Sequence, residues 1–373
     1  MTNLMRYKLL GHSGPRVSEL ALGTMAFGED WGWGAAKDEC GRILTAFREA
    51  GGNFVDTADA YTNGTAERYV GELLGSQRDE FVLATKYTAS RNPRDPNGGG
   101  NHRKSLVHGL DASLERLGTD YVDLLWVHIW DFLTPIEEVM RALDDQVRAG
   151  KVLYVGISDT PAWIIARANA IAEQHGWTPF IAVQAQYSLI ERTTERDLAP
   201  MARALDLALC AWSPLGSGLL TGKYHGADAN SEGRLHNPSV GGNGLLNERN
   251  FAIARAVGEV AAELDATSAQ VALAWLRSRP GVVLPILGAR KQSQLIDNLG
   301  ALEIELDRDQ RARLDDASAI DLGFPHQFIA DVRQTPFVLG EAGDRIDDHR
   351  AERSGLVVGH HPQPEQLEPE PSR

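Results

Sequence analysis

Short apolar runs alternate with amphipathic segments along most of the chain. Each run is followed by a segment in which apolar residues recur three and four positions apart, which is the spacing of a helix. Runs without polar alternation are typical of parallel strands that helices cover on the outer face. The pattern predicts strands at residues 20–22, 54–56, 81–86, 122–128, 152–158, 181–184, 207–212 and 282–287.

The number of repeated units indicates how the sheet is closed. Eight strand–helix units predict an α/β fold of the (β/α)8 TIM barrel class. An open, doubly wound sheet is the alternative, but the G-x-G-x-x-G turn expected after its first strand is absent. Helices are expected at residues 37–50, 66–74, 103–117, 136–149, 161–175, 194–204, around 250–277, and 292–299.

Several regions lie outside the repeat. Residues 6–20 carry Gly and Pro at their centre and predict an N-terminal β-hairpin cap. Residues 214–247 are rich in Gly and Asn and predict a loop at the C-terminal mouth of the barrel, where functional residues collect. Residues 320–350 predict an irregular C-terminal extension. We expect one domain over residues 1–350 and a disordered, acidic, Pro-rich tail over residues 351–373.

Charge and composition narrow the function classes. The chain has 37 basic and 51 acidic residues and a formal net charge of −14, which disfavours nucleic acid and anionic membranes as partners. A phosphate-bearing ligand therefore needs a local basic site. Cys40 and Cys210 have no zinc-ligand spacing and are expected to be free thiols, so no metal is predicted. Without a signal-like apolar core or a run near the ~20 residues of a membrane span, we expect a cytoplasmic protein.

Four chemically distinctive residues stand at the ends of consecutive early runs. The second run ends in Asp56, and Tyr61 follows it in the stretch NFVDTADAY. The third run ends in Lys86, and the fourth ends in His128. Because parallel strands of a barrel bring their C-terminal ends to one mouth, these side chains are expected to converge around Tyr61.

The four residue types together predict an acid catalyst. A phenol titrates near pH 10, and a neighbouring ammonium is expected to lower that pKa. Asp56 would keep Lys86 charged, and His128 would hydrogen-bond a substrate oxygen, so that Tyr61 protonates a developing alkoxide. Because the set contains no nucleophile–base pair, metal cluster or glycosidase-like carboxylate pair, the reaction needs a hydride donor from elsewhere.

The later runs end in residues suited to a nicotinamide cofactor. Ser158, Asp159 and Gln184 could bond a carboxamide, and Trp212 offers a flat face for the nicotinamide ring. The backbone of residues 213–218 could form an anion nest for a pyrophosphate.

A basic site for a further phosphate follows the eighth run. Arg290 and Lys291 open the expected last helix, where the helix dipole also favours anions. They suit a 2′-phosphate and so favour NADPH over NADH.

These stretches together resemble the aldo-keto reductase family over roughly residues 6–340. The matching stretches are LALGTMAFG, NFVDTADAY, FVLATK, LGTDYVDLLWVH, GKVLYVGIS, AWSPLGSGLLTGKY and LPILGARKQSQLIDN. The stretch HIWDFLTPIEEVMRALDDQVRAGKVLYVGISDTPAW is more similar to the aryl-alcohol dehydrogenase-like branch than to the aldose reductase branch. The beta subunits of potassium channels share this fold.

The resemblance implies a role for each matching residue. Tyr61 is implied as the proton donor, with Asp56, Lys86 and His128 as its partners, and NADPH is implied to lie extended across the barrel mouth. In the family pattern, Asp159 stands where many members carry Asn, and Gln186 stands where many carry Glu. With Asp56 and Asp159, the implied cofactor positions are Gly23, Thr24, Ser158, Gln184, Trp212, Ser213, Leu215, Ser217, Lys223, Arg234, Gly288, Arg290, Gln294 and Asn298.

The sequence thus predicts an NADPH-dependent reductase of aldehydes or ketones that is reversible with alcohols. Two alternatives stay open: a nicotinamide-binding regulatory subunit like those of potassium channels, and an NAD-dependent sugar or alcohol dehydrogenase. The substrate is expected to be a small molecule, and the aromatic pocket residues favour an apolar or aryl carbonyl. The expected pocket residues are Met25, Trp31, Trp33, Trp130 and Tyr187, together with the loop 214–247. Assembly into a homo-oligomer is left open.

Overall fold

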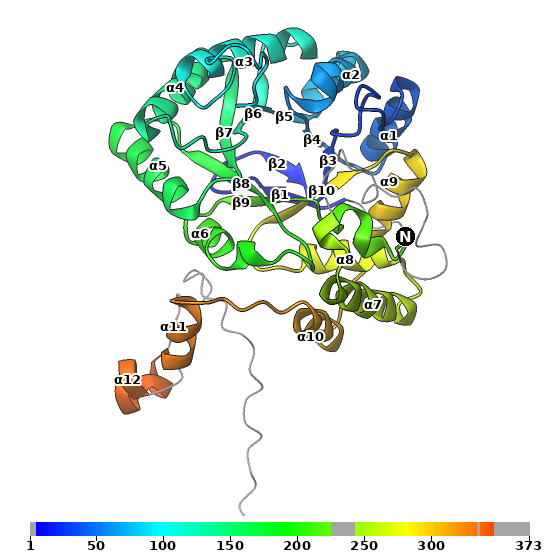
Figure 1. Cartoon of the computed structure of the whole chain (residues 1–373), viewed down its shortest axis with the longest axis vertical. Helices are drawn as coiled ribbons and strands as arrows, with labels where there is room; N and C mark the ends of the chain where they lie inside the picture. Colours follow the sequence, from blue (N-terminus) through cyan, green and yellow to red (C-terminus); the bar gives the residue numbers. More distant parts are fainter. Residues whose placement is uncertain (1–4, 225–242, 334–335, 347–373) are drawn as a thin grey trace, which may run out of the picture.

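Eight parallel strands form a closed barrel, which confirms the predicted fold class. The computed structural model describes residues 5–224, 243–333 and 336–346 (Figure 1). Strand β10 lies between β9 and β3, so the first and last strands of the barrel pair and close it. The strands are β3 (Ala21–Gly23), β4 (Phe54–Asp56), β5 (Val82–Tyr87), β6 (Val122–Val127), β7 (Val152–Ser158), β8 (Phe180–Gln186), β9 (Ala208–Trp212) and β10 (Val283–Gly288).

Helices surround the barrel as an outer ring (Figure 1). Local sequence explains several of their ends: Gly118 terminates α3 in the left-handed conformation, and Thr267 with Gln270 forms a capping box that starts α8. The helices are α1 (Lys37–Glu49), α2 (Thr65–Leu74), α3 (Arg103–Leu117), α4 (Ile136–Arg148), α5 (Ala162–His175), α6 (Leu198–Ala204), α7 (Glu248–Glu263), α8 (Ser268–Arg277), α9 (Gln292–Leu299) and α10 (Arg308–Ala317).

The N-terminal hairpin closes the end of the barrel opposite the strand C-termini. It pairs β1 (Tyr7–Leu9) with β2 (Arg16–Ser18) in antiparallel fashion, as the sequence predicts. The backbone N–H of His12 donates to the carbonyl of Asp206 at 2.7 Å, just before β9 begins. Leu10 and Val17 join the apolar cluster that fills the barrel interior. This packing closes one end of the barrel, and the cavity of the described residues opens at the other mouth.

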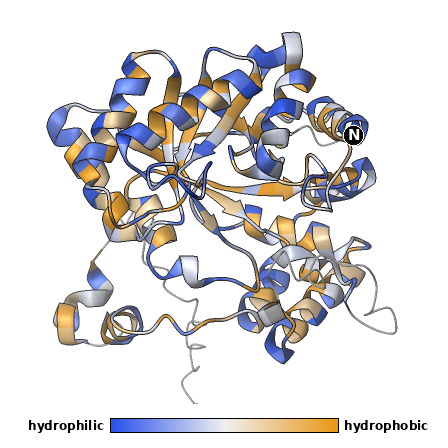
Figure 2. Ribbon diagram, turned by 45° about the horizontal axis from the view of Figure 1, so that its top comes forward, coloured by the Kyte–Doolittle hydropathy of each residue, from blue (hydrophilic) through white to orange (hydrophobic). Residues whose placement is uncertain are grey.

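Two apolar clusters make up the core. One fills the barrel and includes Phe54, Leu124 and Trp126, which are fully buried. The larger one lies between the strands and the surrounding helices, where the helices turn their apolar sides inward (Figure 2). The alternation of strand side chains sorts residues between the clusters, so that Phe54 faces the interior and Val55 faces the helices.

Two segments differ from the sequence expectation. The long helical stretch expected around residues 250–277 is two helices, α7 and α8, because Asp265 adopts a positive φ of 49° between them. The extension expected to be irregular contains α11 (His326–Arg333) and α12 (Pro336–Leu339), which stand away from the barrel in Figure 1. Its aromatic residues Phe324, Phe328 and Phe337 are exposed. The tail from residue 351, with the domain boundary placed at 350, lies outside the described residues and stays a prediction.

Candidate active site at the barrel mouth

A cavity of about 910 Å³ opens at the C-terminal ends of the barrel strands. Strands, loops and the first turns of α9 contribute to its wall. Its sequence-predicted lining residues are Gly23, Met25, Trp33, Asp56, Tyr61, His128, Ser158, Asp159, Gln184, Trp212, Ser213, Leu215, Ser217, Lys223, Gly288, Arg290, Gln294 and Asn298. The structure therefore brings together residues from both ends of the sequence in one elongated site.

A buried ion pair lies at the floor of the cavity. Nζ of Lys86 donates to Oδ2 of Asp56 at 2.5 Å, and the exposed fractions of the two side chains are 0% and 3%. Nζ also donates to the carbonyl of Thr57 at 2.8 Å, and Nε2 of Gln184 donates to the other Asp56 oxygen at 3.0 Å. Burial alone would lower the pKa of Lys86, but the charge of Asp56 holds it above its usual value. Lys86 therefore carries a positive charge at neutral pH.

The loop after β4 carries Tyr61 over this pair. Nζ of Lys86 lies 4.7 Å from the centroid of the Tyr61 ring. A tight turn follows, in which Thr62 and Asn63 have positive φ angles of 45° and 54° before α2 begins. The hydroxyl of Thr62 donates to the carbonyl of Phe27 at 2.7 Å and fastens this turn to the loop after β3. Tyr61 is thus held at the mouth by backbone geometry on both sides.

Burial raises the pKa of Tyr61, contrary to the lowering expected from the sequence. The positive charge of Lys86 does lower this pKa, but loss of hydration outweighs that effect and the negative charge of Asp56 adds to the increase. The expected lowering depended on the ammonium of Lys86, whose effect on the phenol is smaller than the loss of hydration. Tyr61 is consequently a neutral phenol at physiological pH, able to donate its proton.

His128 stands beside Tyr61 as a neutral imidazole. The two ring centroids are 6.2 Å apart, and the rings meet edge to face at 81°. Burial, with a further contribution from the charge of Lys86, lowers the pKa of His128 to about 3. Its backbone N–H donates to the carbonyl of Tyr87 at 3.1 Å, which fixes the strand end that carries it. A neutral imidazole at this place can donate one hydrogen bond to a substrate oxygen.

The ends of β7, β8 and β9 form a polar wall next to the ion pair. Oγ of Ser158 is buried and has no hydrogen-bond partner within the described residues, although it lines the cavity. Nε1 of Trp212 donates to Oδ1 of Asp159 at 3.0 Å, so the indole ring is held from its edge. A buried hydroxyl without a partner beside a fixed aromatic ring matches the needs of an amide-bearing ring ligand.

A run of left-handed backbone follows Trp212. Ser213, Gly216, Ser217 and Gly218 have φ angles of 54°, 55°, 56° and 93°. The N–H groups of this segment are bonded within it: those of Gly216 and Gly218 donate to the carbonyls of Ser213 and Leu215 at 2.9 Å, and that of Ser217 donates to Oγ of Ser213 at 3.2 Å. Gly218 approaches Lys223, because a Cβ there would lie 2.8 Å from the lysine Nζ. The backbone nest expected from the sequence is therefore filled internally, and the segment brings the cation of Lys223 to the cavity.

The far end of the cavity is formed by the start of α9. Arg290 is exposed, and its backbone N–H donates to Oε1 of Gln294 at 2.9 Å. The first N–H of α9, on Gln292, already donates to Oε1 of Glu39 at 2.6 Å. Part of the helix N-terminus is therefore satisfied by a carboxylate, and an incoming anion at this end depends mainly on the cationic side chain of Arg290.

Comparison with known proteins decides the family. The family model described as aldo/keto reductase family matches residues 19–319, which cover all eight barrel strands. The chain belongs to the aldo/keto reductase family. It is accordingly an oxidoreductase that acts on carbonyl and alcohol groups.

Individual relatives are similar over most of their length. Norsolorinic acid reductase of Aspergillus flavus is 40% identical over 342 residues, covering 88% of this chain and 85% of the relative. A putative aryl-alcohol dehydrogenase of Saccharomyces cerevisiae is 38% identical over 343 residues, with 88% and 91% covered. Aryl-alcohol dehydrogenase (NADP+) of Phanerodontia chrysosporium is 37% identical over 365 residues, with 92% and 93% covered.

Some expected pocket residues of this aldo/keto reductase lie elsewhere. Tyr187 is buried outside the cavity lining, where its hydroxyl donates to Glu195 at 2.7 Å and its ring meets Trp275 edge to face. Trp130 is buried in the outer core, and Trp31 packs against Trp33 with ring centroids 5.8 Å apart.

Two expected cofactor positions, Thr24 and Arg234, are not among the described residues that line the cavity. Thr24 is fully buried and does not line the cavity, because its hydroxyl donates to the carbonyl of Asp56 at 3.0 Å. Thr24 thereby ties the end of β3 to β4, and its contact with a cofactor stays a prediction. Arg234 lies outside the described residues.

Asp297 and Ile286 also line the cavity, although they are not among the residues predicted from the sequence. Asp297 lies three positions after Gln294 and one before Asn298, so the helical period of α9 could have placed it on the same side. Ile286 faces the barrel interior and belongs to the same apolar cluster as Leu284 and Ala21. The strand alternation gives this orientation, but an apolar residue carries no chemical signal of a site.

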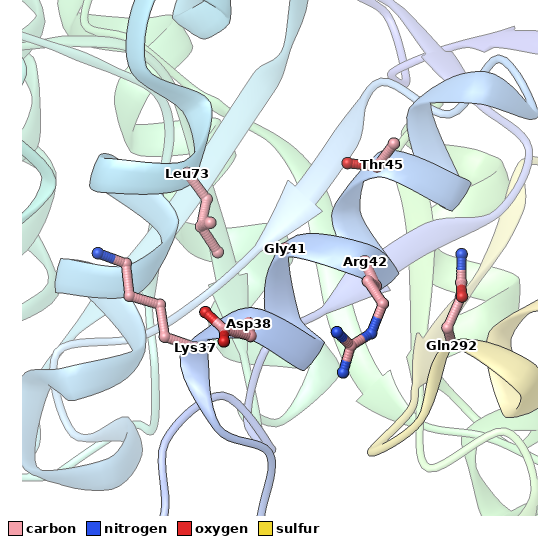
Figure 3. Close-up of a pocket in the computed structure, with 7 residues that line it drawn as sticks. All are labelled: Lys37, Asp38, Gly41, Arg42, Thr45, Leu73 and Gln292. Atoms are coloured by element: carbon pink, nitrogen blue, oxygen red, sulfur yellow. The ribbon is translucent and has the colours of Figure 1, made fainter.

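A second depression, of about 470 Å³, lies on the outer surface between α1, α2 and α9. Figure 3 shows its side chains spread over the surface without converging on one point. Lys37 pairs with Glu72, and Arg42 pairs with Glu39, so neither cation is left over for a ligand. We assign no function to it.

The described residues contain no cluster of His, Cys, Asp and Glu that could hold a metal ion. They also contain no helix of the length and apolarity that a membrane span requires.

Proposed function

We propose that this aldo/keto reductase is an NADPH-dependent reductase of aldehydes and ketones, reversible with alcohols, in which Tyr61 is the general acid. The observation that carries the proposal is the buried Asp56–Lys86 pair directly beneath Tyr61 and next to a neutral His128. The phenol, kept protonated by burial, donates to the carbonyl oxygen as negative charge develops there. His128 orients the same oxygen through its N–H.

The chain's residues fit a nicotinamide cofactor at this site. Ser158 and Gln184 offer hydrogen bonds to a carboxamide, Trp212 offers a stacking face, and Lys223 and Arg290 offer cations for the phosphates. When bound there, the cofactor supplies hydride to the carbonyl carbon. Arg290 supports the choice of NADPH, because a guanidinium binds a 2′-phosphate in a forked geometry. A relative named for NADP+ gives independent support.

Replacement of Tyr61 by Phe tests the assigned acid. We expect the turnover number to fall by about 10²–10⁴-fold, because proton transfer to the alkoxide loses its donor. The dissociation constant for NADPH should stay within about twofold, as the proposed cofactor contacts come from other strands. Tyr7→Phe is the matched control, since Tyr7 lies in the hairpin at the opposite end and bonds only the Gly51 carbonyl. Near-normal reduction by Tyr61→Phe would show that another group is the acid.

Replacement of Arg290 by Ala tests the cofactor. Wild type should bind NADPH more tightly than NADH, and Arg290→Ala should lose most of this preference. Arg16→Ala removes an exposed arginine from the hairpin and should leave the preference unchanged. A wild-type preference for NADH contradicts the proposal and favours an NAD-dependent sugar or alcohol dehydrogenase. Tight NADPH binding without turnover of any carbonyl favours a regulatory subunit.

We also infer that the substrate is an aryl or other apolar carbonyl. Met25 and Trp33 line the cavity near the acid, and Trp31 supports the Trp33 ring. Relatives named as aryl-alcohol dehydrogenases point in the same direction. A panel of aryl aldehydes, short aliphatic aldehydes and sugars, followed by loss of NADPH absorbance, should show the highest kcat/KM for the aryl group. Trp33→Ala should narrow that advantage, and a preference for sugars contradicts the inference. The cytoplasmic location and the question of self-association stay predictions of the sequence.

A further inference from the structure

Asp159 places a carboxylate in the wall of the cavity, at the end of β7. Its Oδ1 accepts the Trp212 indole N–H at 3.0 Å, and both residues line the cavity. Its backbone has a positive φ of 42°, a conformation that Asp and Asn tolerate better than most residues. The carboxylate is therefore fixed beside the face on which a nicotinamide ring would stack.

The other charges at this end of the cavity cancel. Asp56 and Lys86 form a closed pair, and His128 is neutral because its pKa is lowered to about 3. Tyr61 is neutral because burial raises its pKa. Burial raises the pKa of Asp159, and the Trp212 hydrogen bond and the charge of Lys86 oppose this increase. When ionised, Asp159 contributes one negative charge in excess among the described residues that line this end. The cations Lys223 and Arg290 belong to the segment after Trp212 and to the start of α9.

We propose that Asp159 sets the relative affinity of the site for the two redox forms of the cofactor and favours the oxidised form. The oxidised nicotinamide ring carries a positive charge, whereas the reduced ring is neutral. A fixed carboxylate therefore attracts one form and leaves the other nearly unaffected. The inference rests on the proposed function, because it assumes that the ring lies against Trp212. It deepens that function, because a carboxylate that stabilises the oxidised ring favours hydride transfer to the carbonyl on the enzyme.

The bond to Trp212 offers a competing explanation, in which Asp159 only positions the indole ring. The two roles separate because an Asn at this position keeps an oxygen acceptor for the indole N–H and tolerates the same backbone conformation. Asp159→Asn thus removes the charge and preserves the geometry. Trp212→Phe does the reverse, since it removes the indole N–H and leaves the carboxylate and an aromatic face in place.

The test is isothermal titration calorimetry of NADP+ and of NADPH into the full chain at pH 8. Asp159→Asn should raise the ratio of the NADP+ to the NADPH dissociation constant about tenfold, the effect of one charge at several ångströms in a partly hydrated site. Trp212→Phe should weaken both forms and leave the ratio within about twofold. Asp297→Asn removes a carboxylate from the far end of the cavity and should also leave the ratio unchanged.

The outcomes distinguish the inference from the function on which it rests. If wild type binds neither form, the proposed function itself is wrong. If both forms bind and Asp159→Asn leaves the ratio unchanged, the charge has no role and the inference is overturned. An equal change of the ratio in Trp212→Phe also overturns it, because the ratio would then follow the position of the ring and not the charge.

Discussion

The buried Asp56–Lys86 pair should contribute both to the free energy of unfolding and to carbonyl reduction. At 2.5 Å and an effective dielectric constant near 20, the pair attraction is about 7 kcal/mol, and desolvation of both ions offsets most of it. Lys86→Met leaves the Asp56 carboxylate buried with only the Gln184 amide as a partner. We expect this variant to lose about 3–5 kcal/mol of unfolding free energy. Asp56→Asn should lose less, because Lys86 can release its proton.

The double variant isolates the interaction. Asp56→Asn with Lys86→Met removes both charges, so its loss should be smaller than the sum of the single losses by about 3 kcal/mol. Urea denaturation at pH 7, monitored by tryptophan fluorescence, gives the unfolding free energies of wild type, the two single variants and the double variant. This pH suits the measurement because the raised pKa of Lys86 makes its contribution complete below its unfolded pKa of about 10.4. The contribution disappears only as pH rises through the folded pKa.

A surface pair of the same chemistry provides the control. Nζ of Lys151 lies 2.7 Å from Oδ1 of Asp111, and both side chains are about half exposed at 40% and 49%. The same comparison of two single variants with the double variant should give this pair an interaction energy below about 1 kcal/mol. Equal interaction energies for the two pairs would refute the reasoning, because burial would then make no difference. All variants that lack Lys86 or Asp56 should also lose carbonyl reduction, whereas the surface variants should retain it.

Three further predictions follow from buried titratable groups. His128 is neutral with a pKa of about 3, so the pH profile of reduction between pH 5 and 8 should be the same in wild type and in any active His128 variant, such as His128→Gln. Burial, reinforced by the charge of Glu67, raises the pKa of Asp59 to about 7, so folding takes up a proton there between about pH 4 and 7 and stability falls as pH rises through this window. Asp59→Asn should therefore match wild type at pH 4 and exceed it by about 4 kcal/mol at pH 8 in urea denaturation, and equal stability at both pH values contradicts this. Burial also raises the pKa of Cys40 to about 12, so iodoacetamide at pH 8 should label it in urea but not in the native protein, as read by mass spectrometry.

The barrel could be predicted because the pattern of an apolar run followed by a helical segment occurs eight times. Each apolar run predicts one strand independently, so an error at one strand boundary does not change the closure of the sheet. Single residues that interrupt an element carry a much weaker signal. The break between α7 and α8 depends on the left-handed backbone of Asp265 and on the Thr267–Gln270 capping box, within a stretch whose apolar spacing continues through both helices. Helices α11 and α12 lie outside the eight repeated units, so the repeat gives no indication of them.

The site residues were predictable where strand alternation is regular. Asp56, Lys86 and His128 follow inward-facing positions of successive strands, so their approach follows from the parallel order alone. Tyr187 shows where this reasoning stops. Strand β8 extends to Gln186, two residues beyond the expected end, and alternation then turns Tyr187 outward against Trp275. An aromatic residue just past a strand end gives no sign of its direction until the strand length is known.

In the proposed function, two features of one cavity act on the same hydride transfer. Burial raises the pKa of Tyr61 and keeps the phenol protonated, which favours reduction, because oxidation of an alcohol needs the same group as a base. The proposed preference of Asp159 for the oxidised ring acts in the same sense, because it stabilises the positive charge that the ring gains as hydride leaves. The negative charge of Asp159 also contributes to the raised pKa of Tyr61. A change at Asp159 is therefore expected to affect both proton transfer and the cofactor, although Tyr61 follows β4 and Asp159 follows β7.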